Sequence, residues 1–100
     1  MERLKPYLPQ VIAACHHNGV KHLYVFGSIL KDSFNDESDI DFTVDFETND
    51  PLIYTDNYFN LLFKLEDIFG REIDLLEERA LRNPVFKRAI SSQKQLLYGH

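Results

Sequence analysis

The 100-residue sequence predicts a single α/β (α+β) domain, with helices packed on one face of a small mixed β-sheet and a group of carboxylates on the other. Between positions 39 and 46, polar and apolar residues alternate, which is the period of a strand with one buried face. Two further segments, 4–15 and 58–69, carry apolar residues at the spacing of amphipathic helices. This length supplies one hydrophobic core and no second lobe, so we expect one domain over residues 1–100.

The composition excludes several classes of protein. Eight Phe and five Tyr indicate a folded chain, and the net charge of −5 argues against direct binding to nucleic acid through phosphate contacts. No apolar run approaches the length of a membrane span and no signal peptide is recognisable, so we expect a cytoplasmic chain that binds no membrane. The single cysteine, Cys15, excludes an internal disulfide and a cysteine-based zinc site.

The first helix is predicted to end at Asn18-Gly19, a typical helix stop. Its apolar stripe consists of Leu4, Tyr7, Leu8, Val11, Ile12 and Cys15. Cys15 belongs to this stripe, which favours a buried core thiol over a nucleophile. His16 and His17 are neighbours on a helix and point apart, so we interpret them as favourable C-terminal residues and not as joint metal ligands.

A strand over 21–26 is predicted to lead into Gly27-Ser28, followed by a short helix or turn over 28–34 and a polar loop over 35–38. A Gly-Ser turn before a helix can hold phosphate through backbone N–H groups and the hydroxyl. Taken alone, the same dipeptide is ordinary turn chemistry.

The next strand carries Asp39 and Asp41 on the face opposite its apolar residues, with Cα atoms about 6.5–7 Å apart. Carboxylates at alternate strand positions can converge on a cation, which offsets their mutual repulsion. A solvated strand face is the alternative. A calcium loop is disfavoured, because residues 39–50 lack the spaced oxygen ligands and central glycine of an EF-hand.

A second long helix is predicted to end at Gly70. Its stripe consists of Tyr58, Leu61, Leu62, Leu65, Ile68 and Phe69. Phe59 and Phe63 lie beside the stripe and either fill the edge of the core or lie under a partner. We favour the core, because wide stripes are common in small domains.

The strand predicted over 72–76 has Ile73 and Leu75 on one face and Asp74 on the other. If the Ile73 face packs on the helices, Asp74 emerges beside Asp39 and Asp41, and three carboxylates meet at one place. The alternative is that Asp74 is an exposed edge residue. Two further elements are predicted, a helix over 81–91 and a short strand over 95–98.

These motifs resemble the nucleotidyltransferase superfamily of DNA polymerase beta, and within it the minimal nucleotidyltransferase (MNT) proteins. The resemblance covers nearly the whole chain. It rests on Phe26-Gly27-Ser28, Ser38-Asp39-Ile40-Asp41, the segment Gly70-Arg71-Glu72-Ile73-Asp74-Leu75-Leu76 and the closing Leu81-Arg82-Asn83-Pro84. The spacing Gly-Ser, ten residues, Asp-x-Asp is the signature of that family, and the fold it implies is the polymerase beta-like nucleotidyltransferase fold.

The resemblance also implies roles for individual residues. Asp39 and Asp41 would bind Mg²⁺, Asp74 would complete the catalytic and metal site, and Ser28 would contact the nucleotide phosphates. We expect two Mg²⁺ ions and ATP as the substrate, with Asp74 accepting the proton of the acceptor hydroxyl.

The phosphate-binding set is expected to comprise Gly27, Ser28 and Lys31. Family members commonly read Gly-Ser-x-Ala-Arg-Gly, whereas this chain has Lys31-Asp32 in place of Arg-Gly. Lys31 keeps the positive charge without the planar fork of arginine, and Asp32 adds a negative charge near the phosphates. Neither change removes a metal ligand.

MNT proteins usually act beside a helical HEPN protein, often a ribonuclease toxin, so the resemblance implies an antitoxin that attaches AMP to a tyrosine of its partner. Two alternatives stay open: an antitoxin that acts by binding alone, and an adenylyltransferase of small molecules such as antibiotics. The small-molecule enzymes usually carry an added helical domain, for which this length leaves no room. Whether the chain also forms a homo- or hetero-oligomer is left open.

Overall fold

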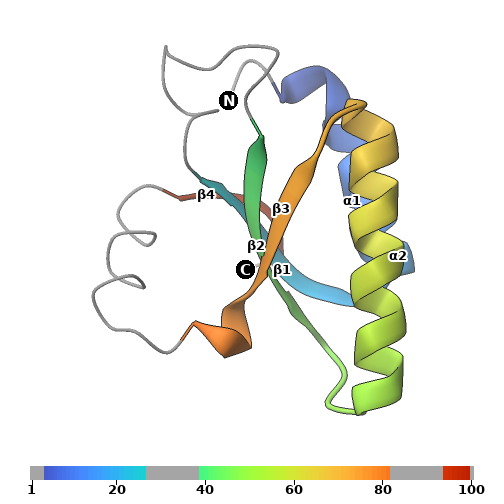
Figure 1. Cartoon of the computed structure of the whole chain (residues 1–100). Coiled ribbons are helices and arrows are strands. Elements are labelled where there is room, and N and C mark those ends of the chain that lie inside the picture. The colour runs from blue at the N-terminus through green and yellow to red at the C-terminus, as the bar shows by residue number, and fades with distance from the viewer. Residues whose placement is uncertain (1–3, 27–38, 82–93, 100) are drawn as a thin grey trace.

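The computed structural model describes residues 4–26, 39–81 and 94–99 of the chain. It confirms the predicted fold class, because a four-stranded mixed sheet packs against helices on one side (Figure 1). The longer helices are α1 (Leu8–His17) and α2 (Pro51–Phe69), and the strands are β1 (Val20–Phe26), β2 (Ile40–Phe46), β3 (Ile73–Glu77) and β4 (Gln95–Gly99). Single 3₁₀ turns precede α1 (Lys5–Tyr7) and follow β3 (Glu78–Ala80).

The strands lie in the order β3-β2-β1-β4. β1 pairs antiparallel with both β2 and β4, while β2 and β3 run parallel. The parallel pair requires a crossover, and α2 supplies it by carrying the chain from the end of β2 back to the start of β3. Both middle strands, β1 and β2, are therefore fixed by hydrogen bonds on either side.

The core lies between the sheet and the two helices. On β2 the predicted buried face is confirmed, since the apolar side chains of that strand are all at most 2% exposed. The buried apolar set is Leu4, Val11, Ala14, Cys15, Val20, Leu23, Val25, Ile40, Phe42, Val44, Phe46, Leu61, Leu65, Ile73 and Leu75. Every strand except β4 contributes to it, which makes the apolar face of the sheet the main support of the fold.

Both helices end as the sequence predicts. Gly19 follows α1 with φ +63°, and Gly70 caps α2 with φ +64°, the left-handed conformation in which glycine carries no steric cost. The Asn18 side chain also donates a hydrogen bond to the Ala14 carbonyl at 2.9 Å. The start of α2 lies earlier than its apolar stripe, because the Asp50 carboxylate accepts hydrogen bonds from the first backbone N–H groups and caps the helix.

Two predictions about the helices are wrong. Ile12 is 44% exposed, because α1 packs through a narrower stripe whose small Ala14 allows close approach. Phe59 and Phe63, which we expected at the edge of the core, are 46% and 61% exposed. The buried Leu61 and Leu65 lie on the opposite side of α2, so a single stripe serves the core and the outer face is left to solvent.

The predicted short helix over 28–34 and the loop over 35–38 lie outside the described residues, as does most of the predicted helix over 81–91. Leu81 itself follows the last 3₁₀ turn and has extended backbone. Within the ranges that the structure describes, no helix is both long and apolar enough to cross a membrane.

Candidate functional site

Two carboxylates lie side by side on the face of the sheet that the helices leave uncovered, which we call the open face. Asp41 on β2 is the direct register partner of Asp74 on β3. Their sequence neighbours Ile40 and Ile73 are buried in the core, so both aspartates project to the opposite side. The sequence prediction that Asp74 emerges beside Asp41 is therefore confirmed.

Asp39 lies just outside the sheet. It precedes the first paired residue of β2 and is exposed, although its charge lies close enough to act on Asp41. Among residues 4–26, 39–81 and 94–99, no three His, Cys, Asp or Glu side chains stand close enough together to hold a metal ion. The expectation that three carboxylates meet at one place is thus fulfilled only for the pair Asp41 and Asp74, because Asp39 has no strand partner to fix its side chain.

The electrostatics of this pair are unusual for surface aspartates. The pKa of Asp41 is raised from 3.8 to about 6, first by burial and then by the charges of Asp74 and Asp39 and a hydrogen bond with Asp74. Asp41 is therefore harder to ionise than an ordinary surface carboxyl, and a bound cation would favour its ionised form. Carboxylate oxygens are the hard ligands that Mg²⁺ prefers, so the chemistry of the donor set fits a magnesium ion.

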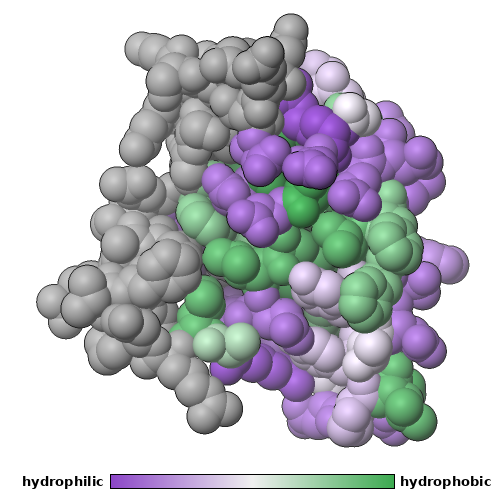
Figure 2. Space-filling model, in the orientation of Figure 1, coloured by the Kyte–Doolittle hydropathy of each residue, from purple (hydrophilic) through white to green (hydrophobic). Residues whose placement is uncertain are grey.

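The centre of the open face is more covered than the strand pattern predicts. Thr43 shares the face of Asp41 and is 2% exposed. Its register partners are Tyr24 on β1 and Leu76 on β3, two large side chains that flank it across the sheet. The open face is thus polar at its two ends and apolar in between, and apolar atoms also reach the surface in the middle of the molecule in Figure 2.

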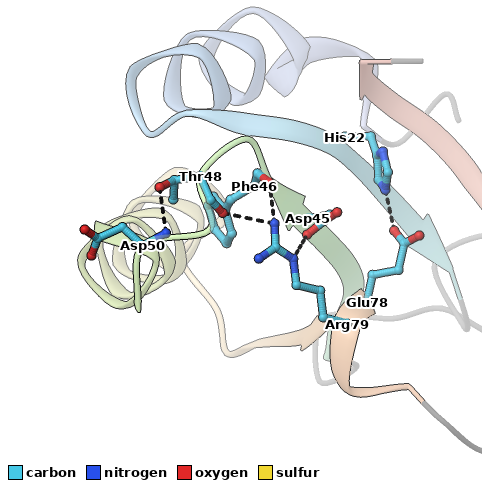
Figure 3. Close-up of polar contacts among 7 residues, drawn as sticks. All are labelled: His22, Asp45, Phe46, Thr48, Asp50, Glu78 and Arg79. Carbon is cyan, nitrogen blue, oxygen red and sulfur yellow. Dashed lines mark hydrogen bonds and ion pairs between the residues drawn. The ribbon is translucent and has the colours of Figure 1, made fainter. Parts of the chain in front are cut away.

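A second polar cluster lies at the far end of the open face (Figure 3). The Arg79 guanidinium pairs with Asp45 at 2.6 Å and donates further hydrogen bonds to the carbonyls of Phe46 and Thr48. Its neighbour Glu78 contacts the His22 ring at 2.5 Å. Every cation and carboxylate in this cluster has a partner, which makes it a structural clamp between the turn after β3 and the strands β1 and β2.

Sequence reasoning missed this clamp. The available signal was the charged pair Glu78-Arg79 directly after the apolar strand. Nothing in the spacing indicates that His22 and Asp45, both more than thirty residues away, lie beside it.

The predicted phosphate-binding residues Gly27, Ser28 and Lys31 lie outside the described residues, so their roles stay predictions. The chain enters that segment from Phe26, the last residue of β1. Phe26 is the register partner of Asp41. Phe26, the last described residue before the predicted phosphate turn, is therefore adjacent to the carboxylate pair in the sheet.

Comparison with known proteins identifies the family to which this chain belongs. The family model described as polymerase beta, nucleotidyltransferase, matches residues 10–100. The chain belongs to the polymerase beta nucleotidyltransferase family. It is 34% identical over 79 residues to a candidate protein adenylyltransferase of Methanocaldococcus jannaschii, MJ1379, in an alignment that covers 79% of this chain and 76% of the relative. It is 31% identical over 72 residues to protein adenylyltransferase MntA of Thermococcus cleftensis, covering 72% of this chain and 70% of MntA.

Solved structures agree with this assignment. A candidate minimal nucleotidyltransferase superposes with a TM-score of 0.75 at 26% identity, covering 94% of this chain and 92% of that one. A chain from a toxin-antitoxin complex with AMP-PNP shares the fold, with a TM-score of 0.71 at 23% identity and a coverage of 93% and 73%. This member of the polymerase beta nucleotidyltransferase family is therefore an enzyme of the minimal nucleotidyltransferase type.

Proposed function

We propose that the chain transfers AMP from ATP to a hydroxyl of a partner protein, a tyrosine of a HEPN toxin, and thereby acts as its antitoxin. The observation that carries the proposal is the pair Asp41 and Asp74, two carboxylates in register on the open face of a minimal nucleotidyltransferase. The charges of Asp74 and Asp39 disfavour ionisation of Asp41, and a bound cation would offset that repulsion. The alignment with MntA, a protein adenylyltransferase, supports AMP as the group transferred.

In this proposal Mg²⁺ is held by Asp41 and Asp74, with Asp39 reaching the site from its exposed position before β2. When bound, Mg²⁺ neutralises phosphate charge and lowers the pKa of an acceptor hydroxyl. Asp41 and Asp74 would carry the negative charge that positions it, and a bound cation would lower the raised pKa of Asp41. Chain residues Gly27, Ser28 and Lys31 are proposed to hold the β- and γ-phosphates.

The proposed reaction is a single in-line displacement at the α-phosphorus of ATP. The acceptor oxygen forms a bond to the α-phosphorus of ATP, and the bond from that phosphorus to the bridging oxygen of the β-phosphate breaks. The bond electrons leave with pyrophosphate, and the hydroxyl proton passes to the Asp74 carboxylate, directly or through one water. The products are an AMP ester of the acceptor and pyrophosphate, and catalysis depends mainly on positioning and on charge stabilisation.

The test follows AMP on the partner. The chain is mixed with its cognate toxin and labelled ATP·Mg²⁺, and the toxin is weighed by mass spectrometry. Wild type is expected to add AMP and neutralise the toxin. Asp74→Asn keeps the side-chain volume on an exposed strand position, so its free energy of unfolding should change by under about 1 kcal/mol while AMP transfer falls by orders of magnitude.

Two results would redirect the proposal. An Asp74→Asn variant that still neutralises the toxin at equal concentration would show that binding alone suffices. Label that appears on a small molecule and never on the toxin would favour the small-molecule adenylyltransferase.

A further inference from the structure

The register of the sheet continues the carboxylate pair across all four strands. Asp74 pairs with Asp41, and Asp41 pairs with Phe26 on β1. β1 and β4 pair Val25 with Gln95, so one further residue along the same ladder sets Lys94 opposite Phe26. The row across the open face therefore reads Asp74, Asp41, Phe26, Lys94.

The Lys94 side chain lies on the open face. Its ammonium nitrogen is 3.9 Å from the centroid of the Tyr24 ring. Tyr24 is the partner of Thr43, which projects to the same side as Asp41. Two strand spacings, roughly 10 Å, separate the backbones at Lys94 and Asp41, and the long lysine side chain spans part of that gap.

Lys94 differs from the other cations described on this face. Arg79 is committed to Asp45 and to two backbone carbonyls, and His22 contacts Glu78. The ion pairs found among the described residues include none with Lys94. Its positive charge rests on an aromatic ring, a contact worth roughly 0.5–1 kcal/mol when exposed, so an anion can recruit it at little cost.

We propose that Lys94 is a phosphate-positioning residue, whose ammonium binds the β- or γ-phosphate of the nucleotide on the side of the site away from Asp74. This assignment rests on the proposed function, since it needs ATP on the open face. An acidic chain of net charge −5 that binds a tetra-anionic nucleotide gains from a cation at the end of the triphosphate. Lys94 is in place to supply it beside Phe26, the residue that precedes the predicted phosphate turn in the sequence.

The experiment measures binding of a nonhydrolysable ATP analogue with Mg²⁺, and separately of AMP, by calorimetry. Lys94→Ala is expected to weaken binding of the ATP analogue by about tenfold and to leave the affinity for AMP within about twofold. The reason is that only the triphosphate reaches the ammonium. Lys94→Arg should restore most of the affinity. Lys64→Ala removes the same charge from the exposed surface of α2 and should leave both affinities unchanged.

The outcomes are separable. If wild type binds the analogue and Lys94→Ala binds it equally well, the assignment of Lys94 is wrong and the proposed function stands. If Lys94→Ala weakens AMP and the triphosphate alike, Lys94 acts only through packing on Tyr24. A wild-type chain that binds no ATP analogue overturns the proposed function and this assignment together.

A different observation concerns the outer side of α2. Leu52, Phe59 and Phe63 are 80%, 46% and 61% exposed. Spaced at i, i+7 and i+11, they lie within about 40° of one another around the helix and form one straight stripe. The Phe59 and Phe63 rings are 6.1 Å apart, so the surface is continuous there. We call these three residues the outer stripe.

On α2 itself, the charged side chains beside the outer stripe are all acidic. Asp56, Glu66 and Asp67 lie within about 60° of it on the helix surface, whereas Lys64 lies farther round, where it lines the groove between α1 and α2. A second copy of this chain would bring acidic flank against acidic flank. A partner helix with an apolar stripe flanked by Lys or Arg would instead match both the apolar and the charged parts.

We infer that the outer stripe is a docking surface for a basic amphipathic helix of a partner protein. The probe is a synthetic helical peptide of about three heptads, with leucine at the a and d positions and lysine elsewhere, compared with its glutamate counterpart. The lysine peptide should bind, the glutamate peptide should not, and Phe59→Ser with Phe63→Ser should weaken binding by at least about tenfold. Because both rings are exposed, the melting temperature of this variant should be nearly that of wild type.

Equal binding of the lysine peptide to wild type and to the double variant would mean that general charge attraction, and not the outer stripe, is responsible. Sedimentation measures whether the chain forms a dimer through the outer stripe. If wild type dimerises and the double variant is monomeric, a second copy covers the stripe and the inference of a basic partner is wrong.

Discussion

Asp41 and Asp74 are direct register partners across the parallel strands β2 and β3. Two carboxylates at neighbouring strand positions repel each other, and here the pKa of Asp41 is raised to about 6 by burial and by the charges of Asp74 and Asp39. In the chain without ligand this pair therefore opposes folding at neutral pH. A bound cation would offset that effect, and the stability of the fold would then depend on the occupancy of the site.

The first prediction concerns pH. Because the folded chain holds a proton on Asp41 up to about pH 6 and the unfolded chain releases it near 3.8, the free energy of unfolding should fall as pH rises through this window. Asp41→Asn should remove that fall and raise the melting temperature at pH 7. The control Asp67→Asn removes an exposed carboxylate of α2 and should leave the slope intact. Identical pH profiles for wild type and Asp41→Asn would show that the pair carries no such cost.

The second prediction concerns the ligand. Mg²⁺ with ATP should raise the melting temperature at pH 7, because both bind only the folded chain. The shift should be smaller at pH 5, where protons compete for Asp41. Asp39→Asn combined with Asp41→Asn should abolish it. A shift that survives in the double variant would place the nucleotide elsewhere on the chain.

The third prediction concerns the clamp at the far end of the sheet. Arg79 holds Asp45 at 2.6 Å and the carbonyls of Phe46 and Thr48 at 2.8 and 3.0 Å. Arg79→Ala leaves those acceptors without their donor, so we expect a loss of about 1–3 kcal/mol in denaturant unfolding. Arg79→Lys should recover only part of it, because an ammonium lacks the planar fork. Nucleotide affinity should change little, since the clamp lies away from Asp41; a large loss of affinity would contradict that separation.

The fourth prediction concerns the lone thiol. Cys15 is fully buried in α1, and burial raises the pKa of its thiol to about 12. It should therefore react with a thiol reagent at neutral pH only when the chain opens, at a rate that follows global unfolding. Variants that destabilise the fold, such as Arg79→Ala, should react faster in proportion. Rapid modification of the native chain would mean that α1 opens on its own.

Much of the architecture can be read from the sequence because its signals are local. The buried apolar positions in 40–46 and the helix stops at Gly19 and Gly70 each depend on a few neighbouring residues, and the structure confirms them. Asp74 could be assigned to the face of Asp41 for the same reason, since strand periodicity fixes which side chains are buried. Where the helix stripe widens, as at Phe59 and Phe63, periodicity cannot tell a core edge from an exposed flank, and the prediction of burial was wrong.

By itself, then, the sequence determined the fold class, which face of each predicted strand is buried and which carboxylates lie on the open face. Those features follow from side-chain periodicity and from motif spacing along one stretch of chain. Only the tertiary structure decided that Asp41 and Asp74 share a register, that Arg79 and Glu78 reach back to Asp45 and His22, and that Lys94 lies over Tyr24. Each of these joins residues far apart in sequence, and such a contact is set by how strands pair and which crossover connects them, quantities that no local pattern encodes.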